Sequence, residues 1–148
     1  MTLSRSSDSL DVLLVEDDPG DIVIAEEALR AGKVASTLHV VNDGVEALEF
    51  LRQEGQHQDA PKPDLILLDL NLPKMGGHEV LSHVKNDPDL RRIPIVVLTT
   101  SQAGEDIVRS YDLYANAYVS KPVDFDDFAD VVKQIDEFFA SVARLSPS

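Results

Sequence analysis

The sequence contains no cysteine, which excludes disulfide bonds, thiolate metal sites and cysteine nucleophiles. It has no apolar run of about 18 residues, the length that a membrane-spanning helix needs, and no charged leader before an apolar segment. Basic residues are scarce, because 13 Lys and Arg stand against 27 Asp and Glu, leaving a formal net charge of −14. This acidity argues against binding nucleic acid or anionic membrane, although it could also serve solubility alone. We therefore expect a cytoplasmic protein that binds cations or basic partner surfaces.

The chain is long enough for one domain, because it has 148 residues of which 43% are hydrophobic. Residues 1–10 include four serines and little apolar content, so we expect a disordered N-terminal tail there. Residues 144–148 have a similar character and are expected to form a C-terminal tail. The folded domain is therefore predicted to span residues 11–143.

Short apolar runs alternate with helical patterns along this domain. The runs that predict strands are Val12–Val15, Thr37–Val41, Leu65–Leu68, Ile95–Leu98 and Ala117–Val119. A first helix is predicted to begin at Pro19 and to stop at Gly32. A second is predicted to follow Asn42-Asp43-Gly44, with Val45, Leu48 and Leu51 facing inward. Further helices are predicted over 78–86, 104–114 and 124–142. The polar segment from Gln53 to Pro63 predicts a surface loop. Five such units predict an α/β, flavodoxin-like (βα)5 fold, with a doubly wound parallel sheet in the strand order 2-1-3-4-5.

An aspartate, Asp69, ends the most apolar of these runs, which begins at Leu65. A carboxylate there costs desolvation energy unless something pairs with it, and ligands of open α/β sheets bind at the carboxyl ends of the strands. Asp69 could also serve only as a cap for its own loop. In the predicted strand order, however, the same edge receives four further polar residues of complementary kinds: Glu16, Asp17, Thr99 and Lys121.

These five groups suggest one chemistry, although each alone is typical of a cap, a solvated charge or a strand former. Three carboxylates repel one another unless they share protons or a cation, and carboxylate and carbonyl oxygens are the ligands that Mg²⁺ prefers. Lys121 adds a positive charge and Thr99 a hydrogen-bond donor. Such a pocket suits a phosphoryl group carried on Asp69.

The same residues give the chain a resemblance to the receiver domains of two-component response regulators. Its signature positions are matched in order by Glu16-Asp17, Asp69, Thr99 and Lys121-Pro122, and its loop after the phosphorylated residue by Pro73 and Gly77. The resemblance covers nearly the whole folded chain, so no output domain is expected. Four stretches are similar to the single-domain regulators that serve phytochrome-type histidine kinases: Leu68–Met75, Val97–Ser101, Tyr111–Tyr118 and Lys121–Val123.

The resemblance implies a role for each matched residue. Asp69 would accept the phosphoryl group from a kinase histidine. The Mg²⁺ ion, for which Mn²⁺ or Ca²⁺ could substitute in crystals, would be held directly by Asp17, through water by Glu16, and by Asp69 and the carbonyl of Asn71. Thr99 and Lys121 would contact the phosphoryl oxygens. Two positions depart from the family pattern, because Glu16 is longer than the usual Asp and Gly76 replaces a frequent Asp.

The resemblance also implies a switch. Tyr118 matches the switch aromatic, which would turn into the space that Thr99 vacates and change the face built by 104–114, 117–119 and 124–142. The Lys121–Pro122 bond is cis in many relatives. The protein would not be an enzyme in the ordinary sense, but a phosphoacceptor that assists its own Mg²⁺-dependent phosphotransfer and dephosphorylation.

Two surfaces are candidates for partners. Val23 lies on the charged side of the first helix, which in this family meets the histidine-bearing helices of the kinase. The last helix has an apolar arc wider than the ~100° that one buried face requires. Deeper burial against the sheet would explain this arc, but we favour a symmetric homodimer that uses Leu113, Val131, Phe138 and Val142.

Three other functions could use a similar fold or a similar set of acids. A haloacid dehalogenase-type phosphatase needs an acid two residues after its nucleophile, where this chain has Asn71. A flavin or nucleotide carrier is disfavoured because the acidic loop Glu16–Gly20 would repel phosphate. A degenerate receiver that acts only as a scaffold, without phosphate, remains the alternative.

Overall fold

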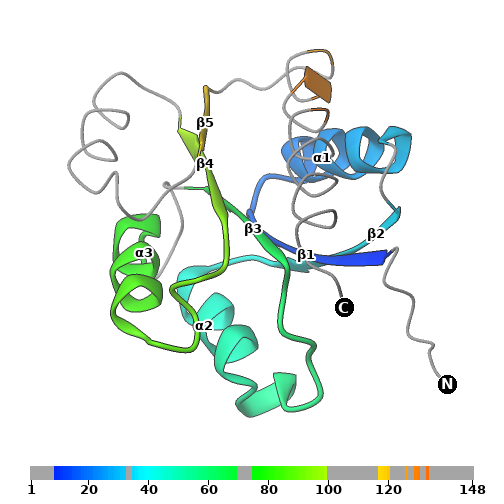
Figure 1. The fold of residues 1–148 in the computed structure, drawn as a ribbon. Helices are drawn as coiled ribbons and strands as arrows, with labels where there is room; N and C mark the ends of the chain where they lie inside the picture. The colour runs from blue at the N-terminus through cyan, green and yellow to red at the C-terminus, as the bar shows by residue number, and fades with distance from the viewer. Residues whose placement is uncertain are drawn as a thin grey trace, which may run out of the picture.

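Parallel strands form a single sheet in the order β2-β1-β3-β4-β5 (Figure 1). The computed structural model describes residues 9–32, 35–69, 75–99 and 117–120, and the single positions 126, 129, 130 and 133. The strands are β1 (Ser9–Val15), β2 (Ala35–Val41), β3 (Leu65–Asp69), β4 (Ile95–Thr99) and β5 (Ala117–Ser120). The strand order and the flavodoxin-like fold expected from the alternating pattern are therefore confirmed.

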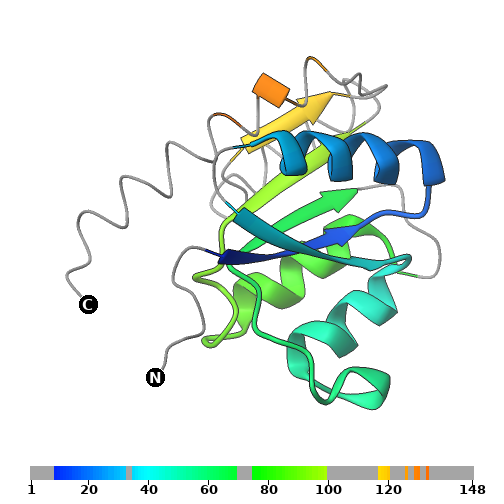
Figure 2. The same cartoon turned by 90° about the vertical axis from the view of Figure 1, so that its right-hand side faces the viewer.

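Three α-helices and one 3₁₀ helix connect these strands within the described residues: α1 (Pro19–Ala31), α2 (Gly44–Arg52), η1 (Gly55–His57) and α3 (Gly77–Asn86). Figure 2 shows α1 on one face of the sheet and α2 and α3 on the other. The side chain of Asp18 caps α1 by accepting hydrogen bonds from the N–H groups of Gly20 and Asp21. Of the helix expected over 124–142, the positions that the structure describes are helical, and the one expected over 104–114 lies outside them. In the part of the chain described, no helix is long and apolar enough to cross a membrane.

The central strand β3 is buried at every position because both faces of the sheet are covered. Ile66 and Leu68 pack with α2 and α3 in one cluster, whereas Leu65 and Leu67 pack with α1 in the other. This alternation is the ordinary two-residue period of a strand. Asp69 therefore ends a strand that is fixed by packing on both sides.

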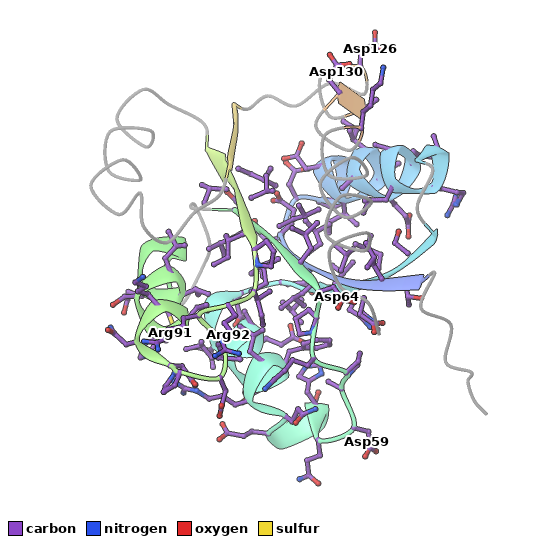
Figure 3. The ribbon with its side chains drawn as sticks, viewed as in Figure 1. Asp59, Asp64, Arg91, Arg92, Asp126 and Asp130 are labelled. Carbon is purple, nitrogen blue, oxygen red and sulfur yellow. The ribbon has the colours of Figure 1, made fainter. Side chains whose placement is uncertain are left out.

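The amino ends of β1 and β3 are joined by two aspartates. The N–H of Asp64 donates to the carbonyl of Asp11 at 2.7 Å, and the N–H of Asp11 donates to the Asp64 carboxylate at 2.9 Å. A carboxylate oxygen of Asp11 lies 3.0 Å from Nε2 of His39 on β2. Figure 3 labels Asp64 at the start of β3. Three strands are therefore tied together at the edge opposite Asp69.

One local expectation was wrong, and another was right but incomplete. Val45 was expected to face inward but is 42% exposed, because the buried stripe of α2 begins one residue earlier, at Gly44, and continues through Ala47, Leu48 and Leu51. The segment from Gln53 to Pro63 is mostly exposed, as expected of a surface loop. It contains η1, and the ring of His57 packs 5.3 Å from that of Phe50 on α2.

Candidate metal site at the carboxyl edge of the sheet

Three acidic side chains meet where β1 and β3 end. Glu16 and Asp17 follow β1 directly, and Asp69 is the last residue of β3. The two strands are neighbours, with Val15 opposite Leu68 in the register. One carboxylate oxygen from each of the three acids lies within 4.8 Å of the others. The structure thus brings together three of the residues that the sequence placed at this edge.

The cluster combines two buried acids with an exposed one. Glu16 is fully buried and Asp69 is 2% exposed, while Asp17 faces solvent. Two unit charges at about 4.8 Å repel by on the order of 3 kcal/mol at an effective dielectric constant of about 20. A fold that keeps Glu16 and Asp69 side by side is therefore suited to hold a cation between them, and the exposed Asp17 leaves a path from solvent.

Glu16 is held by its backbone and by its side chain. Its N–H donates to the carbonyl of Val41 at 3.0 Å, and its own carbonyl accepts from Nδ2 of Asn42, also at 3.0 Å. Its carboxylate accepts from the N–H of Asp18 at 3.1 Å. Both peptide groups that flank Glu16 are therefore fixed by the end of β2.

The turn that supplies Asn42 is itself fixed by a variant of the capping box. The carboxylate of Asp43 accepts from the N–H of Glu46 at 2.8 Å, and the Glu46 carboxylate accepts from the N–H of Asn42 at 3.1 Å. The other Glu46 oxygen lies 3.1 Å from Nε2 of His57. The sequence pattern predicted only that a helix follows residues 42–44. The Asp43-x-x-Glu46 pattern is a signal that could have revealed the box.

A close approach joins this turn to the segment after β3. A Cβ atom added to Gly44 would overlap the carbonyl oxygen of Met75, so only glycine fits there. Met75 is the first described residue after Asp69, because the structure does not describe 70–74. The amino end of α2 therefore lies against the connection that leads from Asp69 into α3.

The remaining candidates divide into those that the structure places and those that it does not. Thr99 ends β4 opposite Ser120, and Tyr118 lies opposite Val97 within β5, so the backbones of both strands end at this edge. Val23 is 54% exposed on α1. The candidates outside the described residues are Asn71, Leu113, Lys121, Pro122, Val131, Phe138 and Val142.

The donor set fits a hard divalent cation. Carboxylate oxygens are the ligands that Mg²⁺, Mn²⁺ and Ca²⁺ share, and each of the three acids offers one to the same small volume. A carboxylate held beside such an ion can also act as a nucleophile toward an electrophile such as a phosphoryl group. Asp69 is the acid best placed for this, because it stands at the end of the central strand.

Comparisons of the sequence with known proteins agree on one family. Residues 12–133 match the response regulator receiver domain. The response regulator Rcp1 of Synechocystis sp. is 42% identical over 134 residues, which cover 90% of this chain and 91% of Rcp1. The aligned region therefore includes about nine tenths of each of the two chains.

Solved structures agree with the sequence match. The Mn²⁺-bound form of Rcp1 superposes with a TM-score of 0.77 at 43% identity, covering 88% of this chain and 94% of that one. The phosphorylated cyanobacterial phytochrome response regulator RcpA superposes with a TM-score of 0.79 at 48% identity, and the match covers 90% of this chain and 96% of RcpA. The bacteriophytochrome response regulator RtBRR superposes with a TM-score of 0.76 at 45% identity, and the match covers 86% of this chain and 76% of RtBRR.

Proposed function

The chain belongs to the response regulator receiver family, and on that premise we propose that it accepts a phosphoryl group from a histidine kinase on Asp69. The observation that supports this assignment is the acid cluster, in which Asp69 ends β3 with its carboxylate within 4.8 Å of those of Glu16 and Asp17. In the transfer, the phosphorus–nitrogen bond of a phosphohistidine breaks as an oxygen of Asp69 bonds to phosphorus. The histidine nitrogen departs with the electron pair.

We propose Mg²⁺ as the resident cation. Asp17 and Asp69 would bind it directly, Glu16 through a water molecule, and Asn71 through its main-chain carbonyl. When bound, the ion supplies positive charge that neutralises the phosphoryl oxygens and the acid cluster. The Mn²⁺-bound form of Rcp1, which is similar to this chain, supports the choice of a divalent ion. Thr99 and Lys121 would contact the phosphoryl oxygens, and Tyr118 would respond to the movement of Thr99.

The proposed partner is a sensor kinase of the phytochrome type. Two of the similar structures, RcpA and RtBRR, are response regulators of a phytochrome and of a bacteriophytochrome. Both are at least 45% identical to this chain. The exposed Val23 on α1 is a candidate contact with the kinase. Self-association into a homodimer through Leu113, Val131, Phe138 and Val142 remains part of the proposal.

Labelling by acetyl phosphate tests the phosphoacceptor. Purified protein is incubated with acetyl phosphate and Mg²⁺, and the gain of one phosphoryl group is followed by intact mass. Wild type should be labelled only with the cation present, and Asp69→Asn should not be labelled. The matched control is Asp59→Asn, because Asp59 is exposed on the loop before β3 (Figure 3) and should label normally. A wild type that takes up no phosphate would favour the phosphate-independent scaffold.

A further inference from the structure

One short turn contacts Glu16 of the acid cluster and also Met75, which precedes α3. This turn, Asn42–Gly44, joins β2 to α2. At one end, the side-chain amide of Asn42 donates to the carbonyl of Glu16 at 3.0 Å. At the other end, Gly44 lies against the carbonyl of Met75. The turn itself supplies none of the three carboxylates.

We propose that Asn42 is a positioning residue for the divalent cation, which it would affect only by orienting Glu16 and Asp17. This inference rests on the proposed function, because it assigns a role at the same site. Asn42 is exposed, and its amide forms a hydrogen bond to a residue 26 positions away. This hydrogen bond reaches the backbone between two of the three acids, from which Asn42 can influence the orientation of both.

The peptide group between Glu16 and Asp17 is the point at which Asn42 acts. Both side chains leave the backbone next to this group, so its orientation sets the directions of the two acids. Their mutual repulsion, and that from Asp69, favours rotation that separates them. The hydrogen bond from Asn42 opposes this rotation in the metal-free protein. The ion would then bind to acids that are already oriented, as groups behind metal ligands commonly ensure.

Asn42 is in turn held by two residues that lie farther from the acids. Glu46 accepts from its N–H at 3.1 Å, and His57 lies 3.1 Å from the second oxygen of Glu46. This chain of contacts runs from η1, through α2, to the carbonyl of Glu16. A Glu46→Gln variant keeps an oxygen acceptor for the N–H of Asn42 and should bind metal nearly as wild type does, whereas Glu46→Ala should bind more weakly.

The direct test is a Mn²⁺ titration of the metal-free full chain, with free Mn²⁺ followed by electron paramagnetic resonance. Asn42→Ala should raise the Mn²⁺ dissociation constant by about 10-fold, at the lower end of the effect of residues behind metal ligands. The matched control is Asn86→Ala. Asn86 is exposed at the end of α3, and its side-chain amide donates a hydrogen bond to the hydroxyl of Ser82 on the same helix. The control should stay within about 2-fold of wild type, and Asn42→Gln should recover part of the affinity.

A second readout separates positioning from a general loss of stability. The rate of labelling by acetyl phosphate is measured against Mg²⁺ concentration, beside the thermal unfolding of each metal-free variant. Asn42→Ala should need about 10-fold more Mg²⁺ for half-maximal rate, with a maximal rate and an unfolding temperature close to those of wild type. Unchanged Mn²⁺ affinity in Asn42→Ala, or a lower maximal rate at unchanged Mg²⁺ requirement, would overturn the positioning role alone. A wild type that binds no Mn²⁺ would overturn the proposed function and this inference with it.

Discussion

Replacing Asp69 by asparagine should make the metal-free protein more stable, although Asp69 is almost fully buried. The substitution removes one of two buried carboxylates that lie within 4.8 Å of each other. At an effective dielectric constant of about 20, the repulsion with Glu16 is on the order of 3 kcal/mol. Asp69 has further interactions in the protein, and the asparagine keeps its shape but not its charge. We therefore expect a net gain of about 1–3 kcal/mol.

Thermal unfolding in the presence of a chelator measures this gain. For a chain of this length, each kcal/mol raises the unfolding temperature by about 2–4 °C, so a rise on the order of 5 °C is expected. Adding Mg²⁺ should stabilise wild type by about 2.7 kcal/mol at 100 times its dissociation constant. The same addition should do little for Asp69→Asn, which has lost a ligand and most of the repulsion that the ion relieves.

The control for this experiment is Asp59→Asn, which removes an equal charge from an exposed loop. It should change the stability by less than about 0.5 kcal/mol and leave the response to Mg²⁺ intact. The reasoning would be refuted if Asp69→Asn unfolded at or below the temperature of metal-free wild type. It would equally be refuted if both proteins gained the same stability from Mg²⁺, because the acids would then not share one ion.

Three further outcomes are expected. Gly44→Ala should cost about 1–3 kcal/mol in urea unfolding, because its Cβ would meet backbone at Met75, whereas Gly20→Ala meets only a side-chain oxygen at 3.2 Å and should be nearly neutral. Val23→Glu should slow phosphotransfer from a phytochrome-type kinase about 10-fold, a loss of 1.4 kcal/mol, and leave labelling by acetyl phosphate unchanged; equal slowing of both would contradict the contact. Phe138→Asp should give a monomer by light scattering, and an unchanged dimer would rule out the proposed seam.

Much of the fold and of the acid cluster could be predicted because both depend on periodic or topological rules. The run from Leu65 to Leu68 is apolar at each position, as a strand covered on both faces must be. Once such strands alternate with helices, their carboxyl ends fall at one edge of the sheet. Glu16, Asp17 and Asp69 could therefore be placed together although more than 50 residues separate the first from the last.

The contacts that hold the cluster could not be predicted in the same way. Gly44 lies on the buried side of α2 and packs closely against Met75, whereas Val45 lies on the exposed side. The contact between His57 and Glu46 depends on how η1 folds back on α2. Such interactions are set by tertiary packing, and the local pattern of residues 42–57 shows only a turn, a short helix and a polar segment.

The two ends of β3 carry aspartates that make different interactions. Asp69 at one end belongs to the acid cluster, while Asp64 at the other joins Asp11 through two hydrogen bonds. Because these ends are separated by the length of a strand, we expect substitutions at Asp64 to change the stability of the protein without moving the acid cluster. In such a fold, adaptation to a new temperature does not require any change at the metal site.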